Sequence, residues 1–297
     1  MLKKKCSNKV KGFLPIVILA IATMLIILTV YCFIYMNKLI ITSYTVETDL
    51  KNPVRIVQLT DLHQAEFGEN NIELIKLVKE QTPDIIVMTG DMQNKNDSNS
   101  DMVCLLVEEL SSIADVYYGY GNHEISWLTN FGSDLENKLT DAGAIVLNNS
   151  FSDISINGNM IRIAGFEGYY GTPHMTEQDK EKKEYELEFM RQFENTDKYK
   201  ILLDHIPTSW VDWQYINKYP VDLVLSGHYH GGVIRIPVIN QGVYAPYVGW
   251  FPSYTKGVYI GTQATCVLST GLGSEQSIPR LNNPPEIVVV DLVPKDL

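Results

Sequence analysis

Cysteine is scarce in this chain, with four residues among 297, and no two of them are close together in the sequence. The lack of closely spaced cysteines excludes the usual cysteine-ligated zinc site. Cys104 and Cys266 both follow the long apolar run near the N-terminus. A disulfide bond between them is compatible with the sequence but not required by it.

Internal repeats, low-complexity tracts and the His-Glu-x-x-His pattern of zinc proteases are also absent. Without that pattern, a metal-dependent amide or peptide hydrolase ranks last among the candidate functions. The chain is 45% hydrophobic and 20% charged, which is enough to bury one sizeable core or two modest ones. A disordered or fibrous protein is therefore not expected.

Basic residues are too few to balance the acidic ones, with 24 Lys and Arg against 35 Asp and Glu. Residues 1–38 hold six of the Lys and no acid, so residues 39–297 keep 18 basic residues against 35 acidic ones, a net charge of −17. Such an acidic domain disfavours nucleic acid as a partner. A phosphate substrate would have to be attracted by local cations, and bound metal ions would supply them.

Charge is missing altogether from residues 13–36, a run of 24 residues. At about 1.5 Å per residue, one helix of this length crosses the hydrocarbon core of a bilayer. The alternative is a cleaved signal peptide, whose apolar region is shorter and is followed by small residues. Bulky residues follow here, namely Tyr31, Cys32, Phe33 and Tyr35, so we favour an uncleaved signal anchor.

Lysines lie mainly on one side of this apolar run: five precede it, whereas only Lys38 and Lys51 lie close behind it. Because cytoplasmic flanks are the more basic, the N-terminus is expected inside the cell and the larger part of the chain outside the cytoplasmic membrane. The expected organisation is a basic cytoplasmic tail at 1–12, a transmembrane signal anchor at 13–36, a polar connector at 37–53 and a single domain at 54–297.

Short apolar runs alternate with helical patterns in the front half of the domain, which is typical of βαβ units and a mixed α/β fold. The predicted strands are 54–59, 85–88, 116–118, 145–147, 161–164, 200–203 and 223–225. The predicted helices are 71–81, 133–142, a solvated helix at 177–195, and 209–218. Strand and loop are expected after Gly231.

Polar side chains follow directly after five of these strands. Because ligands gather outside the carboxyl ends of strands in α/β sheets, the five clusters are expected to meet at one rim. Five of the six histidines lie in the clusters, which leaves only His174 elsewhere. The clusters are Asp61 with His63, Gly90 with Asp91, residues 121–124, Asp204 with His205, and residues 227–232.

Histidine, carboxylate and amide ligands without a thiolate suit borderline divalent metals such as Mn, Fe or Zn. Two such ions, about 3.5–4 Å apart, need a bridging carboxylate and several terminal ligands, and a water they share becomes a nucleophile near neutral pH. The clusters contain this set of ligands.

Five blocks in a fixed order resemble the calcineurin-like metallophosphoesterase family. The resemblance covers residues 54–293. Further matches resemble a bacterial membrane-associated subgroup; they are Asn70-Asn71, Gly231-Gly232, Tyr244-Ala245-Pro246 and residues 282–286. The five family blocks are Asp61-Leu62-His63, Gly90-Asp91, Gly121-Asn122-His123-Glu124, His205, and Gly227-His228-Tyr229-His230.

The resemblance implies two mixed sheets packed as an α/β/β/α sandwich. It also implies two divalent ions, with Asp91 as the bridging ligand. His123 would not bind metal but would face the phosphate, stabilise its charge and protonate the leaving oxygen. The other implied ligands are Asp61, His63 and His230 for one ion, and Asn122, His205 and His228 for the other.

The chain departs from the family pattern at two points. After Gly90-Asp91 the family often has another acidic residue, whereas residues 92–94 here are Met, Gln and Asn. The subgroup commonly has Arg before its Gly-Leu-Gly turn, whereas this chain has Thr270 there. The first difference bears on how the ligands are oriented, and the second removes a cation that would face the substrate.

Several residues keep a structural interpretation beside the functional one. Asp61 and Asp91 are also suitable helix caps, Asn122 a turn former, and the histidines buried hydrogen-bonding residues. His123 is equally compatible with metal ligation or loop packing, and Glu124 is expected to begin a helix without touching metal. Tyr169, Tyr170 and His174 either line a substrate cleft or pack on their own domain.

An aromatic region lies between residues 244 and 254. It either contacts the membrane or an amphipathic substrate, or forms a structural cluster, which is the interpretation the sequence favours. Its members are Tyr244, Tyr247, Trp250, Phe251 and Tyr254.

The expected function is hydrolysis of a phosphodiester or phosphoanhydride at the outer face of the cytoplasmic membrane, with a diester favoured. The substrate would be a phosphate-containing small molecule or a lipid-linked compound. The alternative is a non-catalytic, metal-containing receptor or scaffold for a phosphorylated envelope component.

Overall fold

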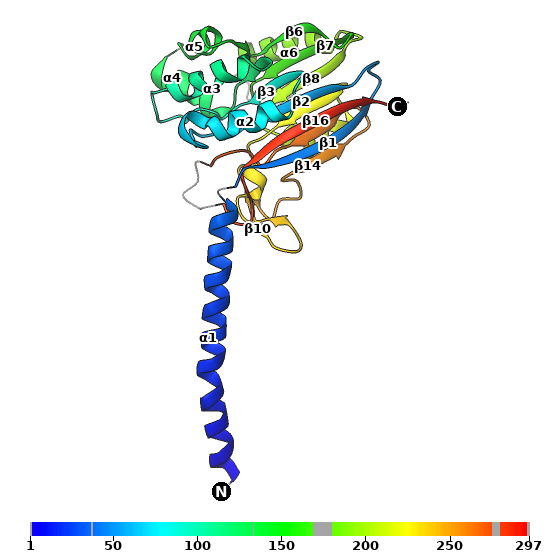
Figure 1. Ribbon diagram of the computed structural model, residues 1–297. Coiled ribbons are helices and arrows are strands. Elements are labelled where there is room, and N and C mark those ends of the chain that lie inside the picture. Colours follow the sequence, from blue (N-terminus) through cyan, green and yellow to red (C-terminus); the bar gives the residue numbers. More distant parts are fainter. Residues whose placement is uncertain (1, 37, 133, 169–179, 275–279, 296–297) are drawn as a thin grey trace.

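Two mixed six-stranded sheets pack face to face, and helices cover the outer face of each (Figure 1). The computed structural model describes residues 2–36, 38–132, 134–168, 180–274 and 280–295. The fold class is α/β, with four layers in the order α/β/β/α, as the resemblance implied.

The first sheet has the strand order β1-β16-β2-β3-β4-β5. Strands β2 to β5 run parallel to one another, and β16 is antiparallel to β2. β3 is buried along its whole length, in keeping with its apolar sequence. The bounds are β1 Ile40–Thr48, β16 Glu286–Pro294, β2 Val54–Leu59, β3 Ile85–Thr89, β4 Asp115–Gly119 and β5 Ala144–Leu147.

The second sheet has the order β14-β15-β9-β8-β7-β6. Its four central strands are parallel, and both edge strands are antiparallel to their neighbours. The bounds are β14 Gly257–Ile260, β15 Thr265–Leu268, β9 Leu223–Ser226, β8 Tyr199–Asp204, β7 Asn159–Phe166 and β6 Ser150–Ile156. Two small hairpins follow β9, formed by β10 Arg235–Ile236 with β11 Gln241–Gly242 and by β12 Tyr244–Ala245 with β13 Gly249–Trp250.

Amphipathic helices complete the outer layers. In α3, for example, Val103, Leu106 and Leu110 are buried at helical spacing and face the first sheet. The helices beside the first sheet are α2 Ile72–Glu80, α3 Asp101–Ser111, α4 Asn122–Phe131 and α5 Leu135–Asp141, and those beside the second are α6 Lys180–Glu194 and α7 Thr208–Val211.

The central core lies between the two sheets. It is built from alternate residues of both sheets, such as Ile56 and Val87 from the first and Leu203 and Leu225 from the second. Separate cores lie between each sheet and its helices, and the cysteines at positions 104 and 266 fall in different ones. Cys104 and Cys266 are free thiols, so they form no disulfide bond.

Two local expectations were wrong. Residues 40–48, expected within a polar connector, form edge strand β1, because its backbone pairs with β16 from Ile40 to Thr48. The helix expected at 209–218 is broken into α7 and a turn at Tyr215–Asn217, because Gln214 has a left-handed backbone with φ 59°. The sequence pattern also did not predict helix α3.

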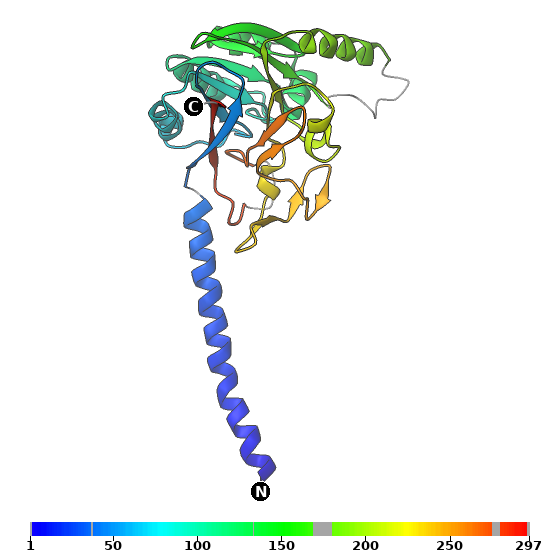
Figure 2. The same ribbon diagram turned by 90° about the vertical axis from the view of Figure 1, so that its right-hand side faces the viewer.

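A single long helix, α1 at Leu2–Met36, projects from the sandwich (Figures 1 and 2). Its segment Leu14–Tyr31 has a mean hydropathy of 2.6. Among the described residues, no other helix is long and apolar enough to cross a membrane.

The central core yields a stability prediction. Leu203 is 1% exposed between the sheets, so Leu203→Ala leaves a cavity and should lower the free energy of unfolding by about 2–5 kcal/mol in urea titrations. Leu105→Ala is the matched control, because this side chain is half exposed on α3; it should change stability by no more than about 0.5 kcal/mol. Equal effects of the two substitutions would contradict the assignment of the core.

Candidate metal centre

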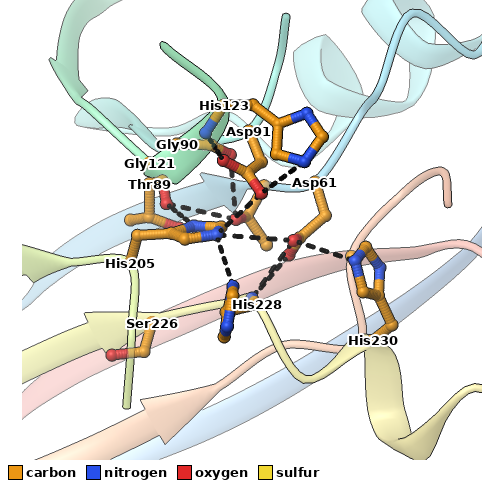
Figure 3. Close-up of polar contacts among 12 residues, drawn as sticks. Asp61, Thr89, Gly90, Asp91, Gly121, His123, His205, Ser226, His228 and His230 are labelled. Atoms are coloured by element: carbon orange, nitrogen blue, oxygen red, sulfur yellow. Dashed lines mark hydrogen bonds and ion pairs between the residues drawn. The ribbon is translucent and has the colours of Figure 1, made fainter. Parts of the chain in front are cut away.

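The loops that follow five strands bring the predicted site residues to one rim of the sandwich (Figure 3). Asp61 and His63 follow β2, Asp91 follows β3, and His205 follows β8. The remaining residues are Asn122 and His123, which open α4 after β4, and His228 and His230, which follow β9. His174, Tyr169 and Tyr170 lie outside the described residues.

Three overlapping groups of side chains are close enough to hold metal ions. In each group the ligand atoms lie within 4.8 Å of one another, and every residue is buried. The groups are Asp61 with His63 and His230, His63 with Asp91 and His123, and Asp91 with His205 and His228. The first group contains the three residues that the resemblance implied for one ion. The third contains two of the three implied for the other ion, His205 and His228, together with Asp91.

Asp91 lies at the centre of these groups. Its Oδ2 is 3.1 Å from His205 Nε2 and 3.9 Å from the Nε2 atoms of both His63 and His123. Asp61 Oδ1 is 3.6 Å from His230 Nε2 and 3.8 Å from His205 Nε2. Both carboxylates therefore lie near histidines of both groups, and Asp91 Oδ2 makes the shorter contact with His205, as a bridging ligand would.

Five of the site residues have left-handed backbone conformations, which non-glycine residues rarely adopt. Such conformations persist only where the surrounding structure holds them, and they concentrate at functional sites. Their φ angles are 53° for Asp61, 47° for His63, 52° for Asp91, 67° for His228 and 45° for His230.

Two glycines allow neighbouring loops to touch the carboxylates. A Cβ on Gly227 would lie 2.3 Å from Asp61 Oδ2, and a Cβ on Gly121 would lie 2.3 Å from Asp91 Oδ1. No side chain fits at either position unless the carboxylate moves. The glycines in these two blocks therefore serve the close packing of the loops.

Burial keeps three of the histidines neutral. It lowers the pKa of His63 to about 4, that of His230, with the help of Arg280, to about 3, and that of His228 well below its usual value. Each of these rings therefore has a lone pair available near neutral pH.

The pKa values of His205 and Asp61 are raised, in contrast to those of the three neutral histidines. Burial also lowers the pKa of His205, but the charge and hydrogen bond of Asp91 outweigh it and raise the pKa to about 10. Burial and the charge of Asp91 raise the pKa of Asp61. The site concentrates negative charge away from water, and a bound cation would neutralise it.

Several buried polar atoms at the rim have no hydrogen-bond partner. Among the predicted site residues they are Nε2 of His63, Nε2 of His228, Nδ1 of His230 and Oδ1 of Asn122. Buried polar groups without partners are rare in proteins, and those at a functional site call for an explanation such as an ion. Imidazole nitrogens, carboxylates and an amide oxygen are groups that borderline divalent metals accept, so the residues fit ions such as Mn, Fe or Zn.

Neighbouring groups orient the ligands. His205 Nδ1 donates to the Thr89 carbonyl oxygen at 2.7 Å, and Asn283 Nδ2 donates to the His230 carbonyl oxygen at 2.6 Å. His63 Nδ1 lies 3.3 Å from Asn94 Oδ1. Asn94 thus supplies the oxygen that orients this ring, in a motif that lacks the family's second acid.

Glu124 joins the second and third motifs. Its carboxylate is fully buried and accepts hydrogen bonds from the backbone N–H groups of residues 91, 92, 93 and 121 and from the Tyr118 hydroxyl, at 2.7–3.0 Å. As expected, Glu124 lies in the first turn of a helix. The sequence did not predict that Glu124 holds the Asp91 loop.

The other departure from the family pattern, Thr270, is a buried residue whose N–H donates to Glu286. Arg280 is a nearby cation, but its guanidinium donates to the carbonyl oxygens of Gly273, Asn283 and Pro284 and so fastens the tail loop. Neither residue provides a cation that faces a substrate.

Tyr247 is a site residue that the sequence did not reveal in this role. Its ring stacks on that of His228, with centroids 5.0 Å apart and planes 13° from parallel. Only its place in the aromatic region marked it in advance, because stacking between residues 19 positions apart depends on the path of the intervening chain.

These loops and buried ligands define a metallophosphoesterase site, and the chain belongs to the calcineurin-like phosphoesterase family, which residues 54–232 match. It is 32% identical over 265 residues to an uncharacterized metallophosphoesterase of Aquifex aeolicus (strain VF5), covering 85% of this chain and 91% of that protein. It is 29% identical to the uncharacterized metallophosphoesterase YkuE of Bacillus subtilis (strain 168), covering 84% of each chain. The phosphodiesterase YaeI of Escherichia coli (strain K12) is 27% identical, covering 81% of this chain and 83% of that protein.

Glu124→Gln tests the joint between the two motifs. Whichever way the new amide turns, its NH₂ group faces backbone N–H groups that now donate to a carboxylate oxygen. We expect the free energy of unfolding, measured by urea titration, to fall by at least about 2 kcal/mol, since each unsatisfied buried group costs about 1–3 kcal/mol. Metal content, measured by mass spectrometry after desalting, should also fall.

The matched control is Glu108→Gln on the exposed face of α3, which should leave stability within about 0.5 kcal/mol of the parent and metal content unchanged. A Glu124 variant that behaves like this control would show that the Asp91 loop holds its shape without the carboxylate.

Proposed function

We propose that the chain is a two-metal phosphodiesterase anchored by α1, with its site at the outer face of the cytoplasmic membrane. The observation that carries this proposal is the buried Asp91 carboxylate, whose Oδ2 faces histidines of both ligand groups. Membership of a phosphoesterase family supports the reaction class. A relative named as a phosphodiesterase supports the choice of a diester.

The proposed ligands are divided around Asp91, which touches both halves. Asp61, His63 and His230 would hold one ion, and the other would take Asn122, His205 and His228. Divalent ions bound there lower the pKa of a coordinated water and offset charge on a phosphoryl group. The chain itself contributes fixed imidazoles, a buried carboxylate pair and a rim of loops that limits access of water.

His123 is proposed as a catalytic residue that donates a hydrogen bond to the phosphate, because of its tautomer. The backbone N–H of Lys95 donates to His123 Nδ1 at 3.3 Å, which places the ring proton on Nε2. His123 Nε2 faces the rim, 3.9 Å from Asp91 Oδ2, and a protonated nitrogen cannot bind metal. It can donate a hydrogen bond to a phosphate oxygen and stabilise the charge that develops there. This neutral ring does not protonate the leaving group, because it would become an imidazolate.

The anchor proposal rests on the apolar segment Leu14–Tyr31 and on the lysines before it. A basic flank on the N-terminal side favours the cytoplasm for that end. The sandwich would then lie outside, where phosphate esters of the envelope are its available substrates.

Hydrolysis of bis(4-nitrophenyl) phosphate by the full chain in detergent with Mn²⁺ tests the reaction. We expect Asp91→Asn to abolish activity and to lose bound metal, because the variant lacks the charge shared by both ligand groups. We expect His123→Ala to keep its metal and lose activity by about 10²–10³-fold, the usual cost of removing one donor that stabilises developing charge. Metal content and initial rates are measured on the same samples.

Thr129→Ala on the exposed face of α4 serves as the control and should match the parent in both measurements. Metal-loaded protein that turns over neither this diester nor a monoester nor pyrophosphate would refute the hydrolase and favour the receptor or scaffold.

Orientation is tested separately by fusing a reporter to Leu297 that becomes active only outside the cytoplasm. We expect an active fusion for the parent chain. Moving the basic residues from the front of the apolar segment to its rear should reduce reporter activity, because the charge bias sets orientation. An inactive parent fusion of normal abundance would show that the sandwich remains inside the cell.

A further inference from the structure

Residues 236–255 contain no Asp, Glu, Lys, Arg or His, although residues 39–297 as a whole carry a net charge of −17. The segment lies between Arg235 and Lys256 and includes most of the two small hairpins that follow the last metal-ligand loop. Twenty consecutive uncharged residues at the surface of so acidic a domain point to surroundings other than bulk water.

Large apolar side chains of this segment lie exposed together. Val238 and Trp250, for example, are 103% and 70% exposed. Val238 also has a left-handed backbone with φ 74°, which is rare for a β-branched residue. We call this surface the apolar rim; it consists of Val238, Ile239, Tyr247, Val248, Trp250 and Phe251. The sequence favoured a structural cluster for the aromatic residues between 244 and 254. That prediction is wrong for Tyr247, Trp250 and Phe251, because their side chains face outward.

The apolar rim lies at the end of the sandwich from which α1 emerges. Helix α1 ends at Met36 and strand β1 begins at Ile40, and Thr42 of this strand donates to the Glu286 carboxylate. The same carboxylate accepts a hydrogen bond from Lys256 Nζ at 2.6 Å, and Lys256 directly follows the uncharged segment. In both ribbon views the hairpins around β10 descend beside the upper end of α1 (Figures 1 and 2).

The apolar rim is also continuous with the metal centre. Tyr247 stacks on His228, one of the proposed ligands. The backbone of Phe251 donates to the Val243 carbonyl oxygen, and Val243 in turn donates to that of Gly232, directly after the His230 loop. A surface that holds the apolar rim would therefore lie beside the mouth of the metal site.

We propose that the apolar rim docks on the lipid bilayer in which α1 is anchored, and that the metal centre acts on phosphate esters in lipid headgroups. This inference rests on the proposed function for the anchor and the hydrolase. The bilayer is the occupant that the geometry favours, because the anchor ends next to the rim. Exposed Trp and Tyr beside aliphatic residues are also typical of protein surfaces at the membrane interface.

Trp250 offers a direct measurement of docking. The four tryptophans are at positions 127, 210, 213 and 250, so α1 contains none, and Trp127 and Trp210 are buried. The full chain is reconstituted in vesicles of phosphatidylcholine and phosphatidylglycerol with and without brominated acyl chains. We expect brominated lipid to quench part of the tryptophan emission in the parent chain and to quench clearly less of it in Trp250→Phe. Equal emission from the parent in the two kinds of vesicle would overturn docking.

The substrate is tested with a pair of matched variants. The double substitution Val238→Ser and Ile239→Ser removes apolar groups from the rim, and Ile260→Ser does the same at an exposed position on β14, outside the rim. Each chain is assayed on vesicles of phosphatidylethanolamine, phosphatidylglycerol and cardiolipin and on soluble bis(4-nitrophenyl) phosphate. We expect the double variant to lose at least tenfold on vesicles and to stay within twofold on the soluble diester, with Ile260→Ser matching the parent on both.

The outcomes separate this inference from the proposed function. Turnover of the soluble diester without turnover of the vesicles overturns the lipid substrate and leaves the hydrolase standing. No turnover of either substrate refutes the phosphodiesterase, while quenching still decides on docking. Chemical cross-linking between copies through the rim, lost in the double variant, would overturn docking in favour of a second copy of the chain.

Discussion

Two buried carboxylates, Asp61 and Asp91, lie at one rim of the sandwich. The arrangement of the histidines and loops around them depends on the need to balance their charge. His205 is held between them with a raised pKa, while burial keeps His63 and His230 neutral. Strained backbone and unpartnered ligand atoms persist beside them because the loops are fixed from outside. Divalent ions bound at this rim would balance the charge of both carboxylates and give the unpartnered atoms a partner.

The sandwich brings the carboxyl ends of strands from two sheets to that rim. The central core locks the sheets together through side chains such as Val87 and Leu203. Glu124 then joins the Asp91 loop to the start of α4 by hydrogen bonds. The tail loop packs against Asp61 at Gly271, where an added Cβ would lie 2.5 Å from the Cβ of Asp61. These contacts hold the loops that carry the candidate ligands, and the exposed apolar hairpins lie to one side of them.

Much of this arrangement could be predicted from residues alone. Strands such as β2 and β3 have nearly unbroken apolar sequences, and the polar residues after them mark the site because strand ends converge. Strand β1 was missed because its inward positions include the polar residues Thr42 and Thr48, and because its partner, β16, lies far along the chain, with Ile40 paired to Glu286. The break at Gln214 was missed because no glycine or proline announces it. Local patterns report local preferences, and both of these features depend on contacts that are distant in sequence.

The sequence by itself determined the types of the candidate ligand residues, their order and the charge-free apolar segment, because each is a property of residue identity and spacing. Only the tertiary structure decided that Asp91 faces both groups of histidines, that Glu124 holds the motifs together, and that Tyr247 stacks on His228. It also decided that the apolar rim faces outward beside the anchor. The physical reason is that these relations join separate loops, whose positions are set by how the two sheets pack and not by any one segment of the chain.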